Sequence, residues 1–370
     1  MERSAEMNIP FVDLKAQYLT IKDELTRGIE QVIEETAFIG GKYVAEFEEA
    51  FARMLGVKHC VGVGNGTDAI YIALRMLGIG RGDEVITVAN TWISTAETIA
   101  QCGAKPVFID ITADQYTIDP DKIEAKITKN TKAIIPVHLY GYPADMDPIL
   151  ALAKKYDLDI VEDCAQAHLA KYKGTNVGLL SDVATFSFYP GKNLGAYGDA
   201  GCIVTNDDIL AEKCRMFANH GALKKHEHKI DGINSRLDAL QAAILSAKLP
   251  HLENWTAKRR EVAALYRKYL HDVDGIKLPP DIVNSVYHLF VIRSAKRDEL
   301  QDFLKSKGIG TSIHYPTPLP LLPVYQHLGY VPSDIPVSAE YQSQILSLPM
   351  YAELSELQVR YVCDQIREFQ

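Results

Sequence analysis

One lysine in this chain stands where its neighbours favour covalent chemistry. Lys192 lies in a tight Pro-Gly loop that follows the apolar run 184–188. A lysine amine held near apolar and aromatic groups loses hydration and gives up its proton more easily. In that state it can attack a carbonyl carbon and form a Schiff base. The structural alternative is a solvated loop lysine beside a turn.

A carboxylate at the end of another predicted strand favours the reactive interpretation. The apolar run 159–161 leads into Glu162 and Asp163, about thirty residues before Lys192. Ligands of open α/β sheets gather at the carboxyl ends of the strands. A carboxylate there can keep a pyridinium nitrogen protonated, so that the ring of pyridoxal phosphate (PLP) withdraws electrons. We assign this role to Asp163, whose structural alternative is an N-cap on the following segment.

A glycine turn before a helix supplies a candidate phosphate site. The predicted strand 59–63 leads into Gly64, Asn65 and Gly66, and a helix is predicted over 68–77. The first N–H groups of such a helix favour an anion. The third glycine of a dinucleotide fingerprint would fall at Thr67, so that pattern fails, and the chain has no P-loop motif. Plain packing of a strand on a helix is the alternative interpretation.

Together with further motifs, these segments resemble the DegT/DnrJ/EryC1/StrS family of PLP-dependent nucleotide-sugar aminotransferases. The likeness spans nearly the whole chain, from 9–14 near its start to His314-Tyr315-Pro316 near its end. The motifs between these ends keep the order and separations of the family. They are 65–69, 162–168, 187–195 and 234–238.

The resemblance implies a role for each matching residue. Lys192 corresponds to the lysine that forms the internal aldimine, and Asp163 to the partner of the pyridine nitrogen. Gln166 matches the position that bonds the phenolic oxygen of the cofactor. Trp92 occupies the place of an aromatic that stacks on the ring, with a core tryptophan as the alternative. The implied phosphate ligands are Gly66, Thr67, Ser187 and Asn234.

The family donates the last of these ligands from the neighbouring subunit, which predicts a homodimer with shared active sites. On physical grounds alone, Asn234 would be a turn residue or a helix cap. His314 and Tyr315 are expected to contact the sugar or the diphosphate of the substrate, although packing explains Tyr315 equally well. Leu169 stands where a glycine is common in relatives, a departure that could reshape the backbone near the cofactor. The preceding residue, His168, is interpreted as structural rather than as an acid or base.

Composition agrees with an enzyme of the cytoplasm. At 370 residues we expect two domains, and the net charge of -9 argues against a nucleic-acid-binding surface. Six cysteines without C-x-x-C pairing fit a reducing compartment. The polar start, residues 1–7, carries no targeting signal and opens with what could be an expression remnant or a frayed end; the apolar runs are too short to cross a membrane. The pair His226 and His228 lacks a third ligand, so no metal site is expected.

Short apolar runs alternate with helical segments at the spacing of βαβ units. Fold type I, as the resemblance implies, is an α/β fold with a mainly parallel seven-stranded sheet between helices and a smaller C-terminal α+β domain. We place the large PLP-binding domain, with its N-terminal arm, at 1–250 and the small domain at 251–370. The strands expected for the large domain are 59–63, 84–88, 106–109, 133–137, 159–161, 184–188 and 202–205, and the later elements are helices 147–156, 239–249, 255–270 and 297–307 and strands 287–292 and 311–315.

The resulting hypothesis is a homodimeric PLP-dependent transaminase that aminates a nucleotide-linked keto-deoxysugar, with L-glutamate as the expected donor. The segments 9–18 and 38–42 resemble the group that acts at C3, which favours a dTDP-linked 3-keto-6-deoxyhexose. The alternatives are a C4 aminotransferase, a PLP-dependent sugar dehydratase and a non-catalytic PLP-fold sensor. Relatives that dehydrate carry histidine at the lysine position, so Lys192 favours transamination.

Overall fold

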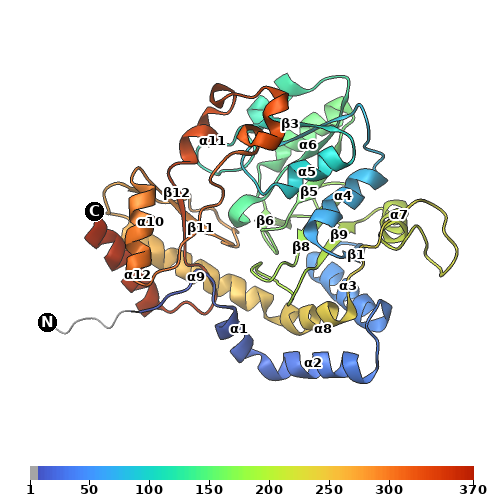
Figure 1. Ribbon diagram of the computed structural model, residues 1–370, viewed down its shortest axis with the longest axis horizontal. Helices are drawn as coiled ribbons and strands as arrows, with labels where there is room; N and C mark the ends of the chain where they lie inside the picture. Colours follow the sequence, from blue (N-terminus) through green and yellow to red (C-terminus); the bar gives the residue numbers. More distant parts are fainter. Residues whose placement is uncertain (1–6) are drawn as a thin grey trace.

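The computed structural model describes residues 7–370 (Figure 1). Residues 1–6, interpreted above as a remnant or a frayed end, lie outside the described residues. The chain after them begins with an arm that pairs Ile9 with Ile309, far away in sequence. It continues through α1 (Leu14–Thr20), which Asp13 caps by accepting the Ala16 N–H at 2.8 Å. Helices α2 (Lys22–Glu34) and α3 (Gly41–Leu55) follow.

A seven-stranded sheet forms the centre of the larger part of the molecule, in the order β1-β9-β8-β5-β4-β2-β3. Strands β3, β2, β4, β5 and β8 are parallel, and β9 is antiparallel to both of its neighbours. The mainly parallel α/β fold is therefore confirmed. The strands are β1 (His59–Val63), β2 (Glu84–Val88), β3 (Lys105–Ile109), β4 (Thr131–Ile135), β5 (Asp159–Asp163), β8 (Val183–Ser187) and β9 (Gly201–Thr205).

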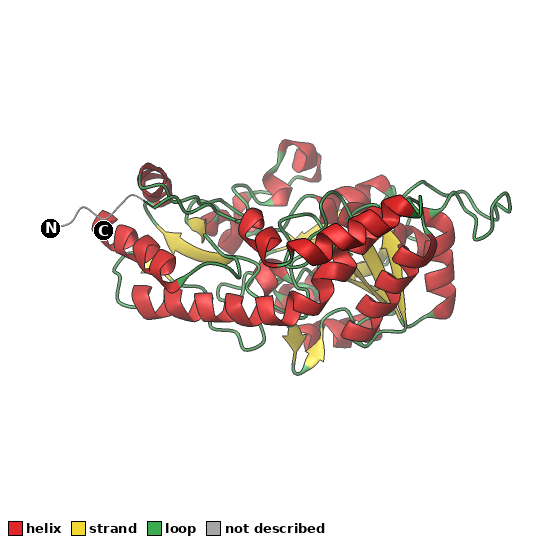
Figure 2. Ribbon diagram, turned by 90° about the horizontal axis from the view of Figure 1, so that it is seen from below, coloured by secondary structure: helices red, strands yellow, loops and turns green. Residues whose placement is uncertain are grey.

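Helices cover both faces of this sheet, as the side view in Figure 2 shows. Strands such as β9 are consequently buried on both faces, which explains their uninterrupted apolar sequences. Local capping fixes where the helices begin: Asn65 accepts the Asp68 N–H at 2.8 Å, and Asp207 accepts those of Ile209 and Leu210. The helices are α4 (Gly66–Met76), α5 (Ser94–Gln101), α6 (Met146–Tyr156), α7 (Asp208–Ala218) and α8 (Ala239–Lys248).

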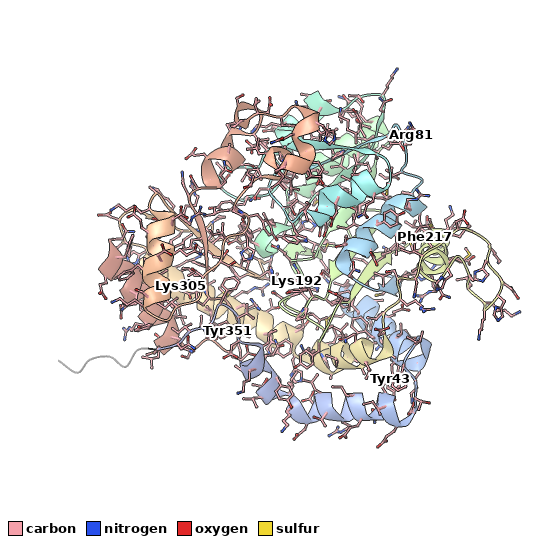
Figure 3. The ribbon with its side chains drawn as sticks, viewed as in Figure 1. Tyr43, Arg81, Lys192, Phe217, Lys305 and Tyr351 are labelled. Atoms are coloured by element: carbon pink, nitrogen blue, oxygen red, sulfur yellow. The ribbon has the colours of Figure 1, made fainter. Side chains whose placement is uncertain are left out.

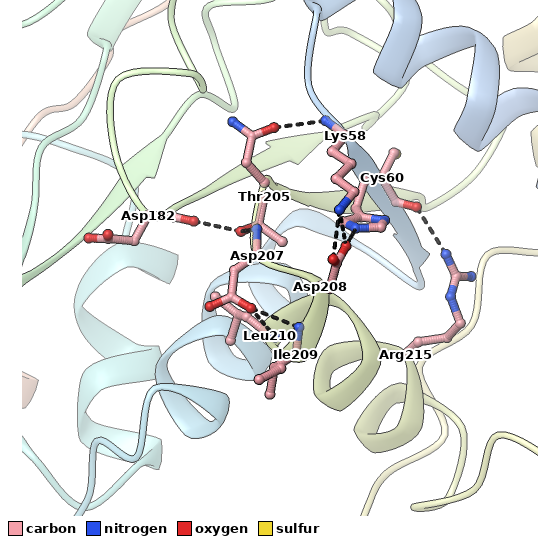
Figure 4. A network of polar contacts seen from close by, with 11 residues as sticks. Lys58, Cys60, Asp182, Thr205, Asp207, Asp208, Ile209, Leu210 and Arg215 are labelled. Carbon is pink, nitrogen blue, oxygen red and sulfur yellow. Dashed lines mark hydrogen bonds and ion pairs between the residues drawn. The ribbon is translucent and has the colours of Figure 1, made fainter.

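A polar network anchors strand β1 to helix α7 (Figure 4). Asp208 takes both Lys58 and His59 as partners, at 2.5 Å each. Arg215 donates to the Cys60 carbonyl at 3.1 Å and pairs with the buried Glu48 at 2.8 Å. The same Glu48 also accepts the N–H of Gly62 at 2.7 Å. Side chains of α3 and α7 thus hold the strand that leads into the glycine turn.

A second, smaller sheet belongs to the C-terminal part of the chain. Helix α9 (Leu252–Leu270) leads from the large sheet to it, and its strands are antiparallel in the order β10-β11-β12. The domain boundary between 250 and 251 stays a prediction. The elements are β10 (Ile276–Lys277), β11 (Phe290–Ser294), α10 (Arg297–Ser306), α11 (Pro336–Tyr341), β12 (Ile345–Leu348) and α12 (Glu356–Phe369), and a separate hairpin is formed by β6 (Lys171–Tyr172) and β7 (Thr175–Asn176).

Two strand predictions in the C-terminal part need correction. The segment 311–315 is not a strand; only Ser312 forms a bridge, with Ser347. Side-chain hydrogen bonds hold it instead, because His314 bonds Ser347 through its ring and accepts from Tyr140 through its carbonyl. The strand predicted at 287–292 begins later, at Phe290, because the preceding backbone bonds to residues 140 and 141 rather than to the small sheet.

The described helices include none that is both long enough and apolar enough to span a bilayer.

Candidate active site

Lys192 lies in the loop between β8 and β9, at the centre of the view in Figure 3. Its backbone N–H donates to the Tyr189 carbonyl at 2.8 Å, which closes a turn. The side chain is half-buried rather than free in solvent. Burial lowers the pKa of Lys192 to about 8, and the charge of Asp163 opposes that shift. The predicted ease of deprotonation therefore has a physical basis here.

The loop that carries this lysine folds back tightly on itself. Ala196 donates its N–H to the Phe188 carbonyl at 2.7 Å. A Cβ at Gly195 would lie 2.3 Å from the Pro190 carbonyl oxygen, so only glycine allows this approach. The Pro-Gly sequence and Gly195 together hold the lysine in a short, closed loop.

Asp163 ends β5 and is buried beside the lysine. Thr95, at the start of α5, donates its hydroxyl to the Asp163 Oδ2 at 2.9 Å, and the Ala165 N–H reaches Oδ1 at 3.1 Å. Burial raises the pKa of Asp163, while these hydrogen bonds and the charge of Lys192 act against the rise. A buried carboxylate with few donors is well suited to bind a protonated ring nitrogen.

Gln166 is fixed in orientation from two sides. Its Oε1 accepts the Tyr140 N–H at 2.7 Å, and its Nε2 donates to the Tyr315 hydroxyl at 3.1 Å. The Tyr315 ring in turn lies 5.6 Å from the ring of Trp92, centroid to centroid. Trp92 is 58% exposed, so the core-tryptophan alternative is wrong. Its ring is available to cover a ligand at this edge of the sheet.

Three of the four predicted phosphate ligands, Gly66, Thr67 and Ser187, meet at the start of α4. A Cβ on Gly66 would lie 2.6 Å from the Ser187 Cβ, so the helix start and the end of β8 touch there. In the described chain no protein oxygen accepts the N–H of Gly66 or Thr67. The Thr67 hydroxyl, which bonds Ser94 at 2.7 Å, lies in the same first turn. The N–H groups of Gly66 and Thr67 and the hydroxyls of Thr67 and Ser187 together form a cradle that suits a phosphate.

The fourth predicted phosphate ligand, Asn234, is not tied to this cradle. Within residues 7–370, its side chain makes no hydrogen bond. It is exposed and forms a bridge with Asn219, and its neighbour Ile233 donates to the Phe217 carbonyl at 2.8 Å. Figure 3 shows Phe217 well apart from Lys192. The contribution of Asn234 to a second subunit stays a prediction.

His314 is held as a neutral ring. Its Nδ1 bonds the Ser347 hydroxyl at 2.9 Å, and the ring stacks on Phe11 with centroids 5.6 Å apart. Burial, together with the charge of Lys192, lowers the pKa of His314 to about 4. The structure therefore brings His314 and Tyr315 to the group around Lys192, although their contacts with a substrate stay a prediction.

The structure adds residues that the sequence analysis missed. Asn193 donates its amide nitrogen to the Val286 carbonyl at 3.1 Å, so its amide oxygen faces the His288 Nδ1, also at 3.1 Å. An amide oxygen only accepts, so Nδ1 of His288 carries the proton. Neither His288, inside an apolar run, nor Thr95 gave a sequence signal. The position next to Lys192 was the only local hint for Asn193.

Three buried side chains elsewhere have the donor types of a metal site. Ligand atoms of His138, Glu162 and Cys164 lie within 4.8 Å of one another. The Ala144 N–H donates to the His138 Nδ1 at 3.0 Å, so the ring proton lies on Nε2 and is donated to Glu162 at 2.9 Å. Both polar partners are thus used in a structural hydrogen-bond pair.

Comparisons with known proteins agree over nearly the full length. A model of the DegT/DnrJ/EryC1/StrS aminotransferase family matches residues 19–367. The chain is 51% identical to a "Pleiotropic regulatory protein" of Geobacillus stearothermophilus, over 98% of this chain and 99% of that protein. It is 44% identical to the dTDP-3-amino-3,4,6-trideoxy-alpha-D-glucose transaminase of Streptomyces venezuelae, over 99% of this chain and 97% of that one. The crystal structure of S. venezuelae DesV in complex with a ketimine intermediate matches with a TM-score of 0.95 at 44% identity, covering 98% of each chain.

Proposed function

Because the chain belongs to the DegT/DnrJ/EryC1/StrS aminotransferase family and is a PLP-dependent nucleotide-sugar aminotransferase, we propose that it aminates C3 of a dTDP-linked 3-keto-6-deoxyhexose. The observation that carries the chemistry is the half-buried Lys192 beside the buried Asp163, next to an open phosphate cradle. The name of the S. venezuelae relative, a 3-amino-sugar transaminase, supports C3 as the position.

The residues present fit PLP. The free N–H groups of Gly66 and Thr67 and the hydroxyl of Ser187 would hold its phosphate. Asp163 would face the ring nitrogen, and Gln166 the phenolic oxygen. The exposed ring of Trp92 would cover one face of the cofactor. A Cβ at Gly66 would collide with Ser187, which explains a glycine there.

Bound PLP supplies an electron-withdrawing ring that stabilises negative charge on the carbon next to the transferred amine. Lys192 serves as the covalent anchor and, once released, as the base that takes the proton from Cα of the amino donor, for which we propose L-glutamate. Its lowered pKa keeps part of the amine neutral near pH 8, as a base requires. Asp163 holds the proton on the ring nitrogen throughout both half-reactions.

The proposed active unit is a homodimer in which Asn234 reaches the phosphate of the partner's site. Support comes from its exposed position, since its neighbour Ser235 is held within the same subunit by donating its hydroxyl to Asp68 at 2.6 Å, while the Asn234 side chain accepts and donates no hydrogen bond among residues 7–370. The test is complementation: mixed Lys192→Ala and Asn234→Ala subunits should regain activity, because one site of the hybrid dimer has both residues. No recovery after demonstrated subunit exchange would contradict the shared site.

Regiochemistry is tested directly with substrates. The enzyme is incubated with L-glutamate and, separately, with 3-keto and 4-keto dTDP-sugars, and NMR locates the new amine. We expect a 3-amino sugar. Amination only at C4 would overturn the C3 proposal and support the C4 alternative, while a dehydrated sugar without an amine would support the dehydratase.

The name of the Geobacillus relative keeps a regulatory, non-catalytic function as the second candidate. It is distinguished by cofactor chemistry, since a sensor has no need of a reactive lysine. Borohydride treatment of the yellow protein, followed by peptide mass spectrometry, should find the cofactor fixed to Lys192. Turnover with sugar substrates by the untreated protein would then exclude a purely regulatory function.

We further propose that the enzyme works in the cytoplasm, where nucleotide-sugar substrates are made. All six cysteines are free and buried, which suits a reducing compartment. Fractionation of the cells with an antibody against the protein tests this placement.

A further inference from the structure

Lys248, the last residue of α8, is completely buried although it carries an amine. Its Nζ donates to the Gly195 carbonyl at 2.6 Å and lies 4.1 Å from the centroid of the Tyr197 ring. Burial lowers the pKa of Lys248 to about 8, and the charge of Glu353 opposes that shift without forming an ion pair. Nothing in the proposed chemistry uses this amine.

Stability does not explain a lysine at this position. Burying an ammonium group is costly unless close partners compensate, and here one carbonyl and one ring face do so. Whole buried ion pairs can be replaced by apolar residues of similar volume without loss of stability, and Lys248 does not even have an ion-pair partner among residues 7–370 to offset its burial. A methionine could therefore fill the same space. The hydrogen bond itself is what an apolar residue would lose.

That bond holds the closing end of the Lys192 loop. Gly195 approaches Pro190 so closely that a Cβ there would lie 2.3 Å from the Pro190 oxygen. On the other side of Gly195, the Ala196 N–H bonds the Phe188 carbonyl at 2.7 Å. Both contacts close the loop that contains Lys192. A movement of Gly195 would therefore shift the backbone that carries the Lys192 amine.

A second residue of α8 contacts the same stretch of chain. Gln241, two turns before Lys248, accepts the Tyr197 N–H through its Oε1 at 2.8 Å. Helix α8 itself packs against α2 and α3, and so provides a rigid base. Gln241 holds only the outer end of the stretch, whereas Lys248 bonds the residue that closes the loop. The two side chains therefore offer a matched pair for comparison.

We propose that Lys248 is a positioning residue that fixes the Lys192 loop so that the Lys192 amine meets the aldehyde carbon of PLP. The inference rests on the proposed attachment of PLP to Lys192. It assigns to a buried lysine outside the cofactor contacts the task of keeping the reactive amine in place. Lys248 acts through the backbone of Gly195 and touches neither cofactor nor substrate.

The test measures covalent attachment rather than turnover. Protein freed of cofactor receives PLP, absorbance follows the attachment, and borohydride followed by mass spectrometry locates the label. We expect Lys248→Met to attach PLP at least about tenfold more slowly, with an unchanged or higher Tm. Lys248→Gln should also be slower, because its shorter side chain cannot reach Gly195. Gln241→Met is the matched control and should attach PLP at the wild-type rate.

The outcomes separate the two proposals. If wild-type protein is labelled elsewhere than at Lys192, the proposed anchor fails, and the inference fails with it. If wild-type protein is labelled at Lys192 and a folded Lys248→Met variant attaches PLP at the wild-type rate, the positioning role is overturned while the proposed function stands. Should Lys248→Met not fold, a wild-type rate in Lys248→Gln overturns it equally. Slow attachment in Gln241→Met as well would show a general packing effect and would also overturn it.

Discussion

Strand β5 places two neighbouring carboxylates in opposite surroundings. Consecutive strand residues point to opposite faces of a sheet, so Glu162 and Asp163 face different groups. Glu162 accepts from His138, from Ser181 at 2.8 Å and from the backbone N–H groups of 178 and 180. Burial acts to raise its pKa, but these hydrogen bonds outweigh burial and hold the pKa of Glu162 below its usual range.

The other face of the strand is left incompletely bonded. Among residues 7–370, only the Thr95 hydroxyl and one backbone N–H donate to Asp163, and burial raises its pKa. The facing lysine has a lowered pKa, and two N–H groups at the start of α4 lack acceptors in the described chain. Complete hydrogen bonding on one face makes His138 and Glu162 a structural pair. On the other face, polar groups that lack hydrogen-bond partners in the described chain can bind a ligand.

Lys192→Ala should have the largest effect on the reactive face. We expect turnover to fall by about 10⁴-fold or more, because the same amine anchors the cofactor and moves the proton. The Tm of the cofactor-free protein should stay the same or rise, because a half-buried amine with a lowered pKa is removed. Single-turnover assays and thermal denaturation measure the two effects. Substantial remaining transamination would remove Lys192 from its role.

Asp163→Asn should have the second-largest effect on turnover. The amide keeps the shape of the side chain but cannot hold a positive ring nitrogen, so we expect turnover to fall by about 10²-fold or more while PLP still binds. Steady-state kinetics and PLP titration give the two values. Near-normal turnover would show that another acid holds the proton.

Glu162→Gln is the matched change on the structural face, and we expect the reverse result. Its amide nitrogen would replace one of the two oxygens that accept the N–H groups of 178 and 180, so a donor would face a donor there, which costs about 1–3 kcal/mol in the free energy of unfolding. Turnover per folded molecule should remain near normal. Denaturant titration measures the loss. A stable Glu162→Gln variant with lost activity would contradict the division between the two faces.

The sequence predicted the strands of the large sheet to within about two residues at each end. Their apolar runs are continuous because both faces are covered, and the alternating helices fix the parallel order. Lys192 and Asp163 were predicted as site residues for the same reason, since Asp163 ends such a run and Lys192 lies in the loop after another. Chemistry at strand ends is therefore visible in sequence when the strand itself is.

Contacts between distant segments could not be predicted. Thr95 reaches Asp163 from helix α5, and His288 reaches Asn193 from the C-terminal part of the chain. No local pattern marks either residue, because what brings them together is tertiary packing. The failed strand 311–315 has the same cause: the segment pairs with β12 only at Ser312, and side chains such as Tyr140 hold the rest of it.

Acid should destabilise the protein through two neutral histidines. Burial lowers the pKa of His168 to about 3 and that of His314 to about 4, below the ordinary value of 6.5. As pH falls below that value, the unfolded chain binds protons that the folded chain resists, so the free energy of unfolding falls. Tm should drop between about pH 6.5 and pH 4. His168→Phe should reduce the drop, and the exposed His327→Gln should not; equal slopes in all three proteins would contradict this assignment.

Leu169→Gly should have the smallest effect on activity. Leu169 has φ of +66°, in the left-handed region that glycine adopts freely, so the leucine follows the backbone path that a glycine would follow. Replacement relieves about 1 kcal/mol of backbone strain. It also removes a side chain that is only 9% exposed and packs in the core around Phe186, a loss of about 2 kcal/mol or more. We therefore expect a modestly lower Tm, with turnover and PLP affinity within about twofold of wild type, because the core cluster that contains Leu169 includes none of the proposed cofactor ligands. A larger change in PLP affinity would show that this residue does reshape the backbone of the reactive face.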